Sequence, residues 1–308
     1  MRKVFIDGRS GTTGLSIFNR LREIPEIEVL TLSDDLRRDE AARKRMLNAC
    51  DAAILCLPDD EARHAVSLIE NEDVIVLDTS TAHRTAPGWT YGFPELSQAQ
   101  RAAVAASGRI AVPGCHASGF IALVYPLVKS GLIAPDTRLV CHSLTGYSGG
   151  GKSMIAQYED PSRGDFFDAP RQYGLTQKHK HLSEMTKVSG LIKEPIFCPV
   201  VADYFRGMEV TVGLFKEDLL NGAAIEDVRE CYRAHYKEGC VRYEESDDES
   251  GFLAANRYAG DDGMTVGVYG NEARMLLCAR FDNLGKGSGA AAVQCLKLAL
   301  SHLDKKEQ

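Results

Sequence analysis

Short apolar runs alternate with amphipathic stretches along the first 115 residues. Runs of about five residues rich in valine, isoleucine and leucine, separated by helix-length segments, are typical of parallel strands buried on both faces. The segment 13–22, between the first two runs, has the period of a helix. The predicted strands are 4–6, 27–32, 52–57, 74–78 and 109–112. The pattern therefore predicts an α/β fold that begins with a Rossmann-type parallel sheet between two layers of helices.

The pattern changes after residue 115, where apolar and polar positions begin to alternate along the later strands. Such strands, predicted over 139–144, 208–215, 264–269 and 275–280, indicate a mixed sheet with one solvated face. An apolar helix is expected over 117–129, with a kink or a break near Tyr125 because Pro126 follows. A last helix is predicted over 288–303. We therefore expect two domains, residues 1–115 with 284–308 and an α+β domain over 116–283.

Composition and charge narrow the class of protein. The chain has 308 residues, 44% hydrophobic and 26% charged, as in ordinary globular proteins. Its net charge of −7 argues against a nucleic-acid partner, so an anionic substrate needs a local cationic pocket. Neither a signal peptide nor an apolar stretch of about 18 residues is visible, which predicts a cytoplasmic protein without a membrane partner. The nine cysteines lack disulfide or zinc spacing, and no metal site is predicted.

A glycine-rich turn joins the first predicted strand to the first predicted helix. Its spacing, G-x-x-G-x-x-G, is a relative of the dinucleotide fingerprint, in which glycines let the backbone approach a pyrophosphate at a helix N-terminus. The candidate cofactor-binding residues of this turn are Gly8, Ser10, Gly11, Thr12, Thr13 and Gly14. The alternative is a strand–helix turn that binds no ligand. The strand before the turn, the helix after it and its place near the N-terminus all match a dinucleotide-binding unit, so we favour a dinucleotide ligand.

The choice of dinucleotide depends on the residues after the second predicted strand. NAD enzymes place an acid there for the ribose hydroxyl, whereas NADP enzymes bring an arginine to the 2′-phosphate. Ser33, Arg37 and Arg38 fit the phosphate, while Asp34 fits the hydroxyl. The arginines favour NADP as the cofactor.

Cys115 follows a strand and a Pro-Gly turn and precedes a helix. The N–H groups and dipole of a helix start favour a thiolate and can stabilise an oxyanion on the carbon it attacks. We therefore interpret Cys115 as a nucleophile. The remaining cysteines that lie in apolar surroundings are interpreted as buried packing residues: Cys56, Cys141, Cys198, Cys278 and Cys295. The base that a nucleophile needs is not identified by spacing, although His179 and His181 form the one histidine cluster.

Taken together, these residues resemble the N-acetyl-γ-glutamyl-phosphate reductases of arginine biosynthesis, which are related to aspartate-semialdehyde dehydrogenase. The resemblance runs nearly end to end and is strongest to the shorter, second type of that reductase. It is carried by residues 8–14, 78–84, 91–96, 113–115 and 282–287, and by His179 and His181 with Glu184. The longer type has Asn before Pro-Gly-Cys and Tyr after it, where this chain has Val112 and His116.

The resemblance implies roles for particular residues. Cys115 is expected to form a thioester that NADPH reduces, with His179 or, less favoured, His181 as the acid/base, and His116 as a rival. Substrate anions are expected at Arg84 and Lys152, with Glu184 nearby. Asn283 and Gly285 are expected near the nicotinamide. A homodimer or homotetramer is implied as well.

Three other functions remain open from the sequence. A sister reductase acting on β-aspartyl or aminoadipyl phosphate has the same fold and thiol. A glyceraldehyde-3-phosphate dehydrogenase is disfavoured by the residues around Cys115. A non-catalytic sensor of the nicotinamide redox ratio is the third alternative, but such a protein needs no thiol at the start of a helix.

Overall fold

The computed structural model describes residues 1–307, with side chains through Lys305. The chain divides into two compact units, Met1–Gly114 with Ser288–Gln308, and Cys115–Gly287. The predicted domains divide instead after residues 115 and 283, and the first of them includes Gln308, which lies outside the described residues. No helix of the described residues is long and apolar enough to cross a membrane.

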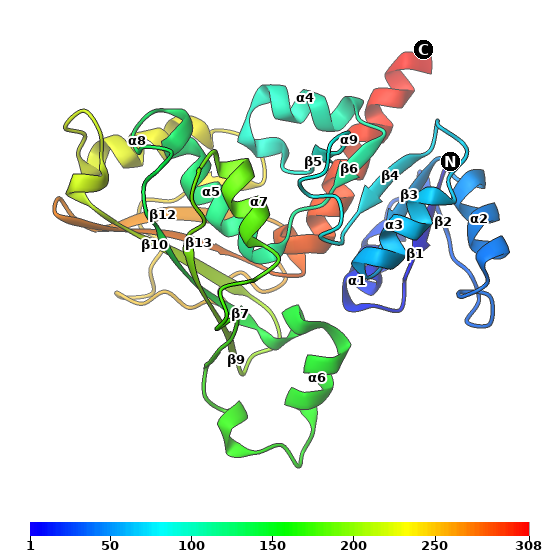
Figure 1. Cartoon of the computed structure of the whole chain (residues 1–308), viewed down its shortest axis with the longest axis horizontal. Helices are drawn as coiled ribbons and strands as arrows, with labels where there is room; N and C mark the ends of the chain where they lie inside the picture. Colours follow the sequence, from blue (N-terminus) through cyan, green and yellow to red (C-terminus); the bar gives the residue numbers. More distant parts are fainter. Residues whose placement is uncertain (308) are drawn as a thin grey trace. The chain divides into compact units, whose positions relative to one another are not determined.

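Six parallel strands form the sheet of the first unit (Figure 1). Their order in the sheet is β2-β1-β3-β4-β6-β5, so the chain reverses direction across the sheet between β1 and β3. The strands are β1 (Arg2–Asp7), β2 (Ile27–Leu30), β3 (Ala52–Leu55), β4 (Ile75–Asp78), β5 (Thr90–Tyr91) and β6 (Arg109–Ala111). In doubly wound sheets such a reversal leaves a crevice at the carboxyl ends of the strands, where ligands bind. The predicted parallel sheet is confirmed, and β5 is an addition to it.

Helices cover both faces of this sheet. They are α1 (Thr12–Leu21), α2 (Glu40–Ala49), α3 (Asp59–Ser67), α4 (Gln98–Ala106) and α9 (Ala290–Glu307). One core joins alternate strand residues such as Val4 and Ile54 to α1, α4 and α9. The other joins the intervening residues, such as Phe5 and Leu55, to α2 and α3. The C-terminal helix therefore belongs to the fold of the N-terminal unit.

The second unit contains a mixed seven-stranded sheet in the order β11-β12-β13-β10-β7-β9-β8. The strands are β7 (Val140–Gly146), β8 (Arg171–Gln172), β9 (Ile196–Ala202), β10 (Met208–Phe215), β11 (Val241–Tyr243), β12 (Met264–Asn271) and β13 (Arg274–Phe281). Burial alternates along β10 and over the first residues of β7 and β13, as expected for a mixed sheet with one solvated face. The first five residues of β12 are all buried, so the alternation expected there is wrong. The sequence missed β8, β9 and β11.

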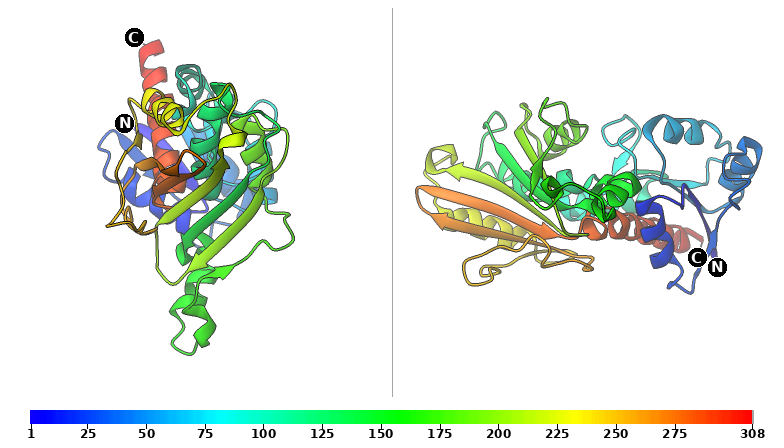
Figure 2. Two further views of the ribbon diagram at one scale, coloured as in Figure 1. Left: turned by 90° about the vertical axis from the view of Figure 1, so that its left-hand side faces the viewer. Right: turned by 90° about the horizontal axis from the view of Figure 1, so that it is seen from below.

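Helix α5 (Cys115–Lys129) packs on the sheet of this unit and beside α7 (Leu182–Ser189) and α8 (Ile225–His235) (Figures 1 and 2). A Cβ added at Gly119 would lie 2.5 Å from a Val210 methyl group, so glycine is needed for this close approach. Another helix, α6 (Gly151–Glu159), extends from the end of β7. These contacts fix the N-terminus of α5, and with it Cys115, against a rigid sheet.

Pro126 does not interrupt α5, so the predicted break near Tyr125 is wrong. A proline lacks the N–H that would bond the carbonyl four residues earlier, here that of Ala122. The hydroxyl of Tyr236 donates to this carbonyl at 2.7 Å. The helix therefore continues because a side chain from another segment supplies the missing donor.

Candidate active site

The predicted glycine-rich turn lies at the carboxyl end of β1, where the strand order reverses. Gly8 has a φ of 88°, and a Cβ there would lie 2.3 Å from the carbonyl oxygen of Cys56. A Cβ at Gly14 would lie 2.5 Å from the carbonyl oxygen of Gly8. Both glycines are therefore required by close backbone contacts, as in a dinucleotide-binding turn.

The first turn of α1 offers donors for an anion. Gly11 is the N-cap residue, and within the described chain its helix start has no side-chain cap. The Thr12 hydroxyl is buried and has no hydrogen-bond partner among the described residues. Buried polar groups are normally satisfied, so this hydroxyl and the free N–H groups fit a bound phosphate.

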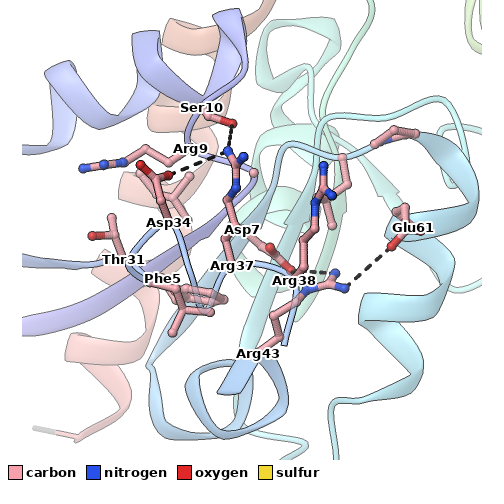
Figure 3. Close-up of a pocket in the computed structure, with 15 residues that line it drawn as sticks. Phe5, Asp7, Arg9, Ser10, Thr31, Asp34, Arg37, Arg38, Arg43 and Glu61 are labelled. Atoms are coloured by element: carbon pink, nitrogen blue, oxygen red, sulfur yellow. Dashed lines mark hydrogen bonds and ion pairs between the residues drawn. The ribbon is translucent and has the colours of Figure 1, made fainter. Parts of the chain in front are cut away.

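A cavity of about 560 Å³ extends from this turn across the ends of β1 and β2 (Figure 3). Arg43 is bonded at its floor to Asp7, at 2.9 and 3.0 Å, and reaches Glu61 at 3.6 Å. Burial raises the pKa of Asp7, and the charge of Arg43 opposes that shift. The lining residues are Phe5, Ile6, Asp7, Gly8, Arg9, Ser10, Thr31, Leu32, Asp34, Arg37, Arg38, Arg43, Leu57, Pro58 and Glu61. Arginines therefore outnumber carboxylates in the lining.

Both predicted arginines line this cavity. Arg37 reaches toward Ser10, at 3.5 Å from its hydroxyl, and lies 3.7 Å from the largely exposed carboxylate of Asp34 (Figure 3). Ser33 is exposed and is not among the described residues that line the cavity. Its hydroxyl bonds to Asp35 and lowers the pKa of that carboxyl. The structure thus assembles Ser10, Arg37 and Arg38 but leaves Ser33 in a neighbouring turn.

Cys115 is the first residue of α5 and is partly exposed. The first N–H groups of a helix have no intrahelical acceptor, so they surround the thiol with donors. A Cβ at Gly287 would lie 3.0 Å from that of Cys115, so glycine is favoured at this close approach to the cysteine side chain. The local geometry is that of an accessible thiol at a positive helix end.

Other cysteines lie in surroundings that oppose ionisation. Burial raises the pKa of Cys50 to about 11 and of Cys56 and Cys278 to about 12. The pKa of Cys141 is raised still further by burial and then by Cys198. These thiols stay protonated near neutral pH and pack as small apolar groups.

The predicted histidine pair lies at the start of α7. The two rings are 4.7 Å apart, and the His181 backbone N–H donates to His179 Nδ1 at 3.2 Å. His181 is the N-cap residue of α7, and its Nε2 lies 3.9 Å from a carboxylate oxygen of the buried Glu184. A carboxylate beside an imidazole orients the ring and balances its positive form. The two histidines therefore have different surroundings, and the carboxylate lies beside His181, not beside the His179 that the resemblance favours.

His116 joins this histidine cluster. Its ring centroid lies 5.9 Å from that of His179 and 5.6 Å from that of His181. Burial, followed by the charge of His179, lowers the pKa of His116 to about 3. A ring with that pKa stays neutral near pH 7, which makes it a poor carrier of a full positive charge.

Arg84 and Lys152 lie in different units. The guanidinium of Arg84 donates to the carbonyls of Val112 at 2.9 Å and Thr79 at 3.0 Å, so it braces the loops that follow β6 and β4. Lys152 is exposed near the start of α6. The structure thus gives Arg84 a bracing role and leaves the Lys152 side chain in solvent.

Asn283 and Gly285 have structural roles in the second unit. The Asn283 amide is buried, donates to Ser148 Oγ at 2.9 Å and accepts from the Gly207 N–H at 2.9 Å. A Cβ at Gly285 would lie 2.3 Å from the carbonyl oxygen of Asp261. Asn283 therefore ties neighbouring segments together, and Gly285 allows the close approach of the backbone at Asp261.

Sequence reasoning missed Tyr173 and Ser143, which bond to the two ring nitrogens of His116, each at 2.7 Å. Tyr173 lies six positions before His179 on the same loop, in the segment after β8. That proximity in sequence was the one available signal. Ser143 carried none, because it is a small residue within an alternating strand.

Two family models match the chain. "Semialdehyde dehydrogenase, NAD binding domain" matches residues 3–104, and "Semialdehyde dehydrogenase, dimerisation domain" matches residues 115–283. Solved structures share the fold: aspartate semialdehyde dehydrogenase II of Vibrio cholerae has a TM-score of 0.74 at 16% identity, covering 98% of each chain. The enzyme of Candida albicans, solved with NADP, has a TM-score of 0.70 at 15% identity, covering 98% of this chain and 99% of that one. The class is thus that of the semialdehyde dehydrogenases, with an NAD(P)-binding domain.

Relatives by sequence are named more narrowly. The N-acetyl-gamma-glutamyl-phosphate reductase of Rhizobium meliloti is 44% identical, over 97% of this chain and 99% of that protein. N-acetyl-gamma-glutamyl-phosphate reductase 2 of a Nostoc species is 42% identical, over 97% and 96%. The chain therefore belongs to the N-acetyl-γ-glutamyl-phosphate reductase family.

Proposed function

We propose that this chain reduces N-acetyl-γ-glutamyl phosphate to N-acetylglutamate 5-semialdehyde and phosphate, using NADPH and a thioester on Cys115. The observation that carries the proposal is a partly exposed thiol at the start of α5, in the same unit as the cluster of His116, His179 and His181. The names of the relatives supply the substrate. Membership of an arginine-biosynthesis family favours a cytoplasmic enzyme.

The first step forms the thioester. The Cys115 thiolate attacks the acyl carbon, the carbon–oxygen bond to phosphate breaks, and the departing phosphate takes up one proton from the solvent. The N–H groups at the start of α5 stabilise the oxygen that gains charge during the attack. A thiol suits both halves of the reaction because it is a good nucleophile and a good leaving group.

The second step reduces the thioester and releases the aldehyde. When bound, the nicotinamide supplies the hydride that converts the thioester to a thiohemiacetal. The carbon–sulfur bond then breaks, the aldehyde leaves, and Cys115 returns to the thiolate. We assign the proton held on the reacting oxygen to His181, because Glu184 lies beside its ring, whereas His179 uses Nδ1 to accept a backbone N–H.

The proposed domain roles follow the two units. The unit of residues 1–114 and 288–308 is proposed to bind the dinucleotide, and the unit of residues 115–287, which contains Cys115, to carry catalysis and oligomerisation. The open face of the seven-stranded sheet carries exposed apolar side chains from β7, β9, β10 and β13: Val140, Ile196, Phe215 and Leu276. Such a patch favours association of two chains as a homodimer, or of four as a homotetramer.

NADP is the proposed cofactor because Ser10, Arg37 and Arg38 line the cavity at the end of β2. The Asp34 carboxylate, which an NAD enzyme would use for the ribose hydroxyl, lies within reach of Arg37 instead. Arg84 and Lys152 are proposed to bind anionic groups of the substrate, and Glu184 is proposed as a further substrate-binding residue. Asn283 and Gly285 are proposed to shape the nicotinamide site through the loops they hold.

The double variant Arg37→Ala, Arg38→Ala is expected to weaken NADP binding by about 10- to 100-fold, because bonds between charged groups are lost. NAD binding is expected to stay within about twofold, since NAD lacks the 2′-phosphate. Fluorescence titration with each reduced cofactor measures both affinities. Arg45→Ala is the matched control, because this exposed arginine of the same unit lies outside the lining. Equal weakening of both cofactors, or of neither, would place the 2′-phosphate elsewhere.

The substrate is tested in the reverse direction. We expect phosphate-dependent reduction of NADP with N-acetylglutamate semialdehyde and much slower reduction with aspartate semialdehyde or aminoadipate semialdehyde. A preference for either control substrate would assign the chain to a sister reductase. Absence of turnover with all three would support the sensor.

A further inference from the structure

The ring of His116 is held between two hydroxyl groups. Nδ1 lies 2.7 Å from Ser143 Oγ and Nε2 lies 2.7 Å from Tyr173 Oη. His116 is 3% exposed and Ser143 is fully buried. Aromatic rings from two further segments face the imidazole, those of His179, His181 and Phe197. The three bonded side chains form a continuous chain inside the unit that also contains Cys115.

The bond between Ser143 and His116 has a preferred direction. Among the described residues, His116 is the one side-chain partner of the Ser143 hydroxyl. If Nδ1 carried the hydrogen, the buried hydroxyl hydrogen of Ser143 would have no acceptor, which is unfavourable. Ser143 therefore donates to Nδ1, and the neutral ring carries its hydrogen on Nε2. That hydrogen is donated to the oxygen of Tyr173.

The direction of this chain frees the last hydrogen. The Tyr173 hydroxyl oxygen accepts from His116, which is the one hydrogen-bond partner of this hydroxyl among the described residues. The hydroxyl hydrogen of Tyr173 is therefore available to a group other than Ser143 and His116. Burial, followed by the negative charge of Cys115, raises the pKa of Tyr173. The Tyr173 hydroxyl is therefore protonated near neutral pH and can donate a hydrogen bond. It is also close enough to Cys115 for the charge of that residue to affect it.

We propose that Ser143, His116 and Tyr173 form a directional hydrogen-bond chain that presents the Tyr173 hydroxyl to the oxygen on the carbon attacked by Cys115. Tyr173 is then a further catalytic residue, and His116 and Ser143 are positioning residues. The inference rests on the proposed thioester chemistry.

A donor at that oxygen accelerates the reaction because the oxygen gains charge only as the carbon becomes tetrahedral. A donor to the sulfur would have the opposite effect, since it would stabilise the thiolate before the attack. His116 contributes by fixing the hydroxyl without taking a charge itself. A positioning role explains why the imidazole next to the nucleophile in the sequence is buried and neutral. A role in proton transfer would not explain it.

Tyr173→Phe tests the donor, because it removes the hydroxyl and keeps the ring. We expect kcat to fall by about 10²- to 10³-fold, as for loss of one oxyanion donor, with KM within about threefold of wild type. The rate and pH midpoint of Cys115 alkylation by iodoacetamide should stay unchanged. Tyr258→Phe is the control, since its hydroxyl lies in the same unit and bonds to Asp247, at 2.6 Å, instead of to the histidine cluster. A kcat within about threefold of wild type, or a shifted alkylation midpoint, would overturn the proposal.

The direction of the chain is tested without substrate. In ¹⁵N-histidine-labelled enzyme, NMR should show His116 as the neutral Nε2–H tautomer from about pH 5 to 9. Ser143→Ala should move population to the Nδ1–H form and lower kcat, whereas Ser189→Ala, at a buried serine bonded to α7 carbonyls, should do neither. An Nδ1–H tautomer in the wild type, or a His116 that titrates in this range, would refute the direction.

Failure of this inference is separable from failure of the proposed function. The wild-type assay with the three semialdehydes decides the function. The ratio of Tyr173→Phe to wild type is then measured with whichever substrate the wild type accepts, and the tautomer needs no substrate.

Discussion

Replacing Cys115 by serine is expected to lower kcat by about 10⁴-fold or more, as for loss of a catalytic nucleophile. A serine hydroxyl is far less acidic than a thiol, so it attacks poorly at neutral pH, and an alkoxide is a poorer leaving group when the aldehyde departs. The side chain is nearly the same size and partly exposed, so the fold and the NADP affinity should be retained. Steady-state turnover, thermal unfolding and cofactor titration measure the three quantities.

Cys198→Ser is the matched control. This residue of β9 lies in the same unit and is partly exposed like Cys115, so the expectation that it is buried was wrong. Its kcat should stay close to that of wild type. Alkylation of Cys115 distinguishes the enzyme from a redox sensor. A sensor would still bind NADPH after the modification, whereas the enzyme would lose turnover. Retention of more than a few per cent of activity in Cys115→Ser would rule out the thioester.

The strands that could be predicted are those whose burial shows as a short apolar run in the sequence. The strands β1, β3, β4 and β6 contain continuous apolar runs because both faces of the parallel sheet are covered, whereas the edge strand β2 carries the exposed Glu28. The two-residue strands β5 and β8 are too short to carry a pattern. β9 contains Pro199, which lacks a donor for the ladder and argues against a strand in sequence reasoning.

The course of α5 depended on tertiary structure that no local rule contains. Pro126 correctly signals a missing hydrogen bond, but Tyr236, which supplies the replacement, comes from a segment more than one hundred residues later. The hydroxyl donates to Ala122 from just beyond α8. A break was therefore a sound local expectation that a distant side chain overruled.

In the candidate site, too, some residues could be found from local sequence and others depend on tertiary structure. Gly8, Gly14 and Cys115 were identified because turns and helix starts have chemistry that is visible in short motifs. Tyr173 was missed because its bond to His116 joins residues 57 positions apart. The Ser33 hydroxyl instead bonds to its near neighbour Asp35. Which polar group reaches a site thus depends on the fold, even where the residue type fits.

His181→Asn is expected to slow turnover by about 10²- to 10⁴-fold, the usual effect of losing a general acid/base. Thioester formation needs a thiolate, which the start of α5 favours without help from histidine. Reduction and release need a proton held on the reacting oxygen, which the imidazole of a general acid/base gives and takes back. Acylation of Cys115 by substrate should therefore survive at a reduced rate, while steady-state kcat falls.

His179→Asn is the matched comparison, because the two rings are 4.7 Å apart and belong to the same loop. If His179 orders that loop by accepting the His181 N–H, its loss should raise KM more than it lowers kcat. Rapid-quench detection of the acyl-enzyme, together with kcat and KM for both variants, measures each step. Should His181→Asn stay within about threefold of wild-type kcat while His179→Asn does not, the acid/base is His179, as the sequence resemblance favours. Full activity in both variants would leave neither histidine as the proton carrier, and the 3.9 Å approach of Glu184 to His181 would have no part in proton transfer.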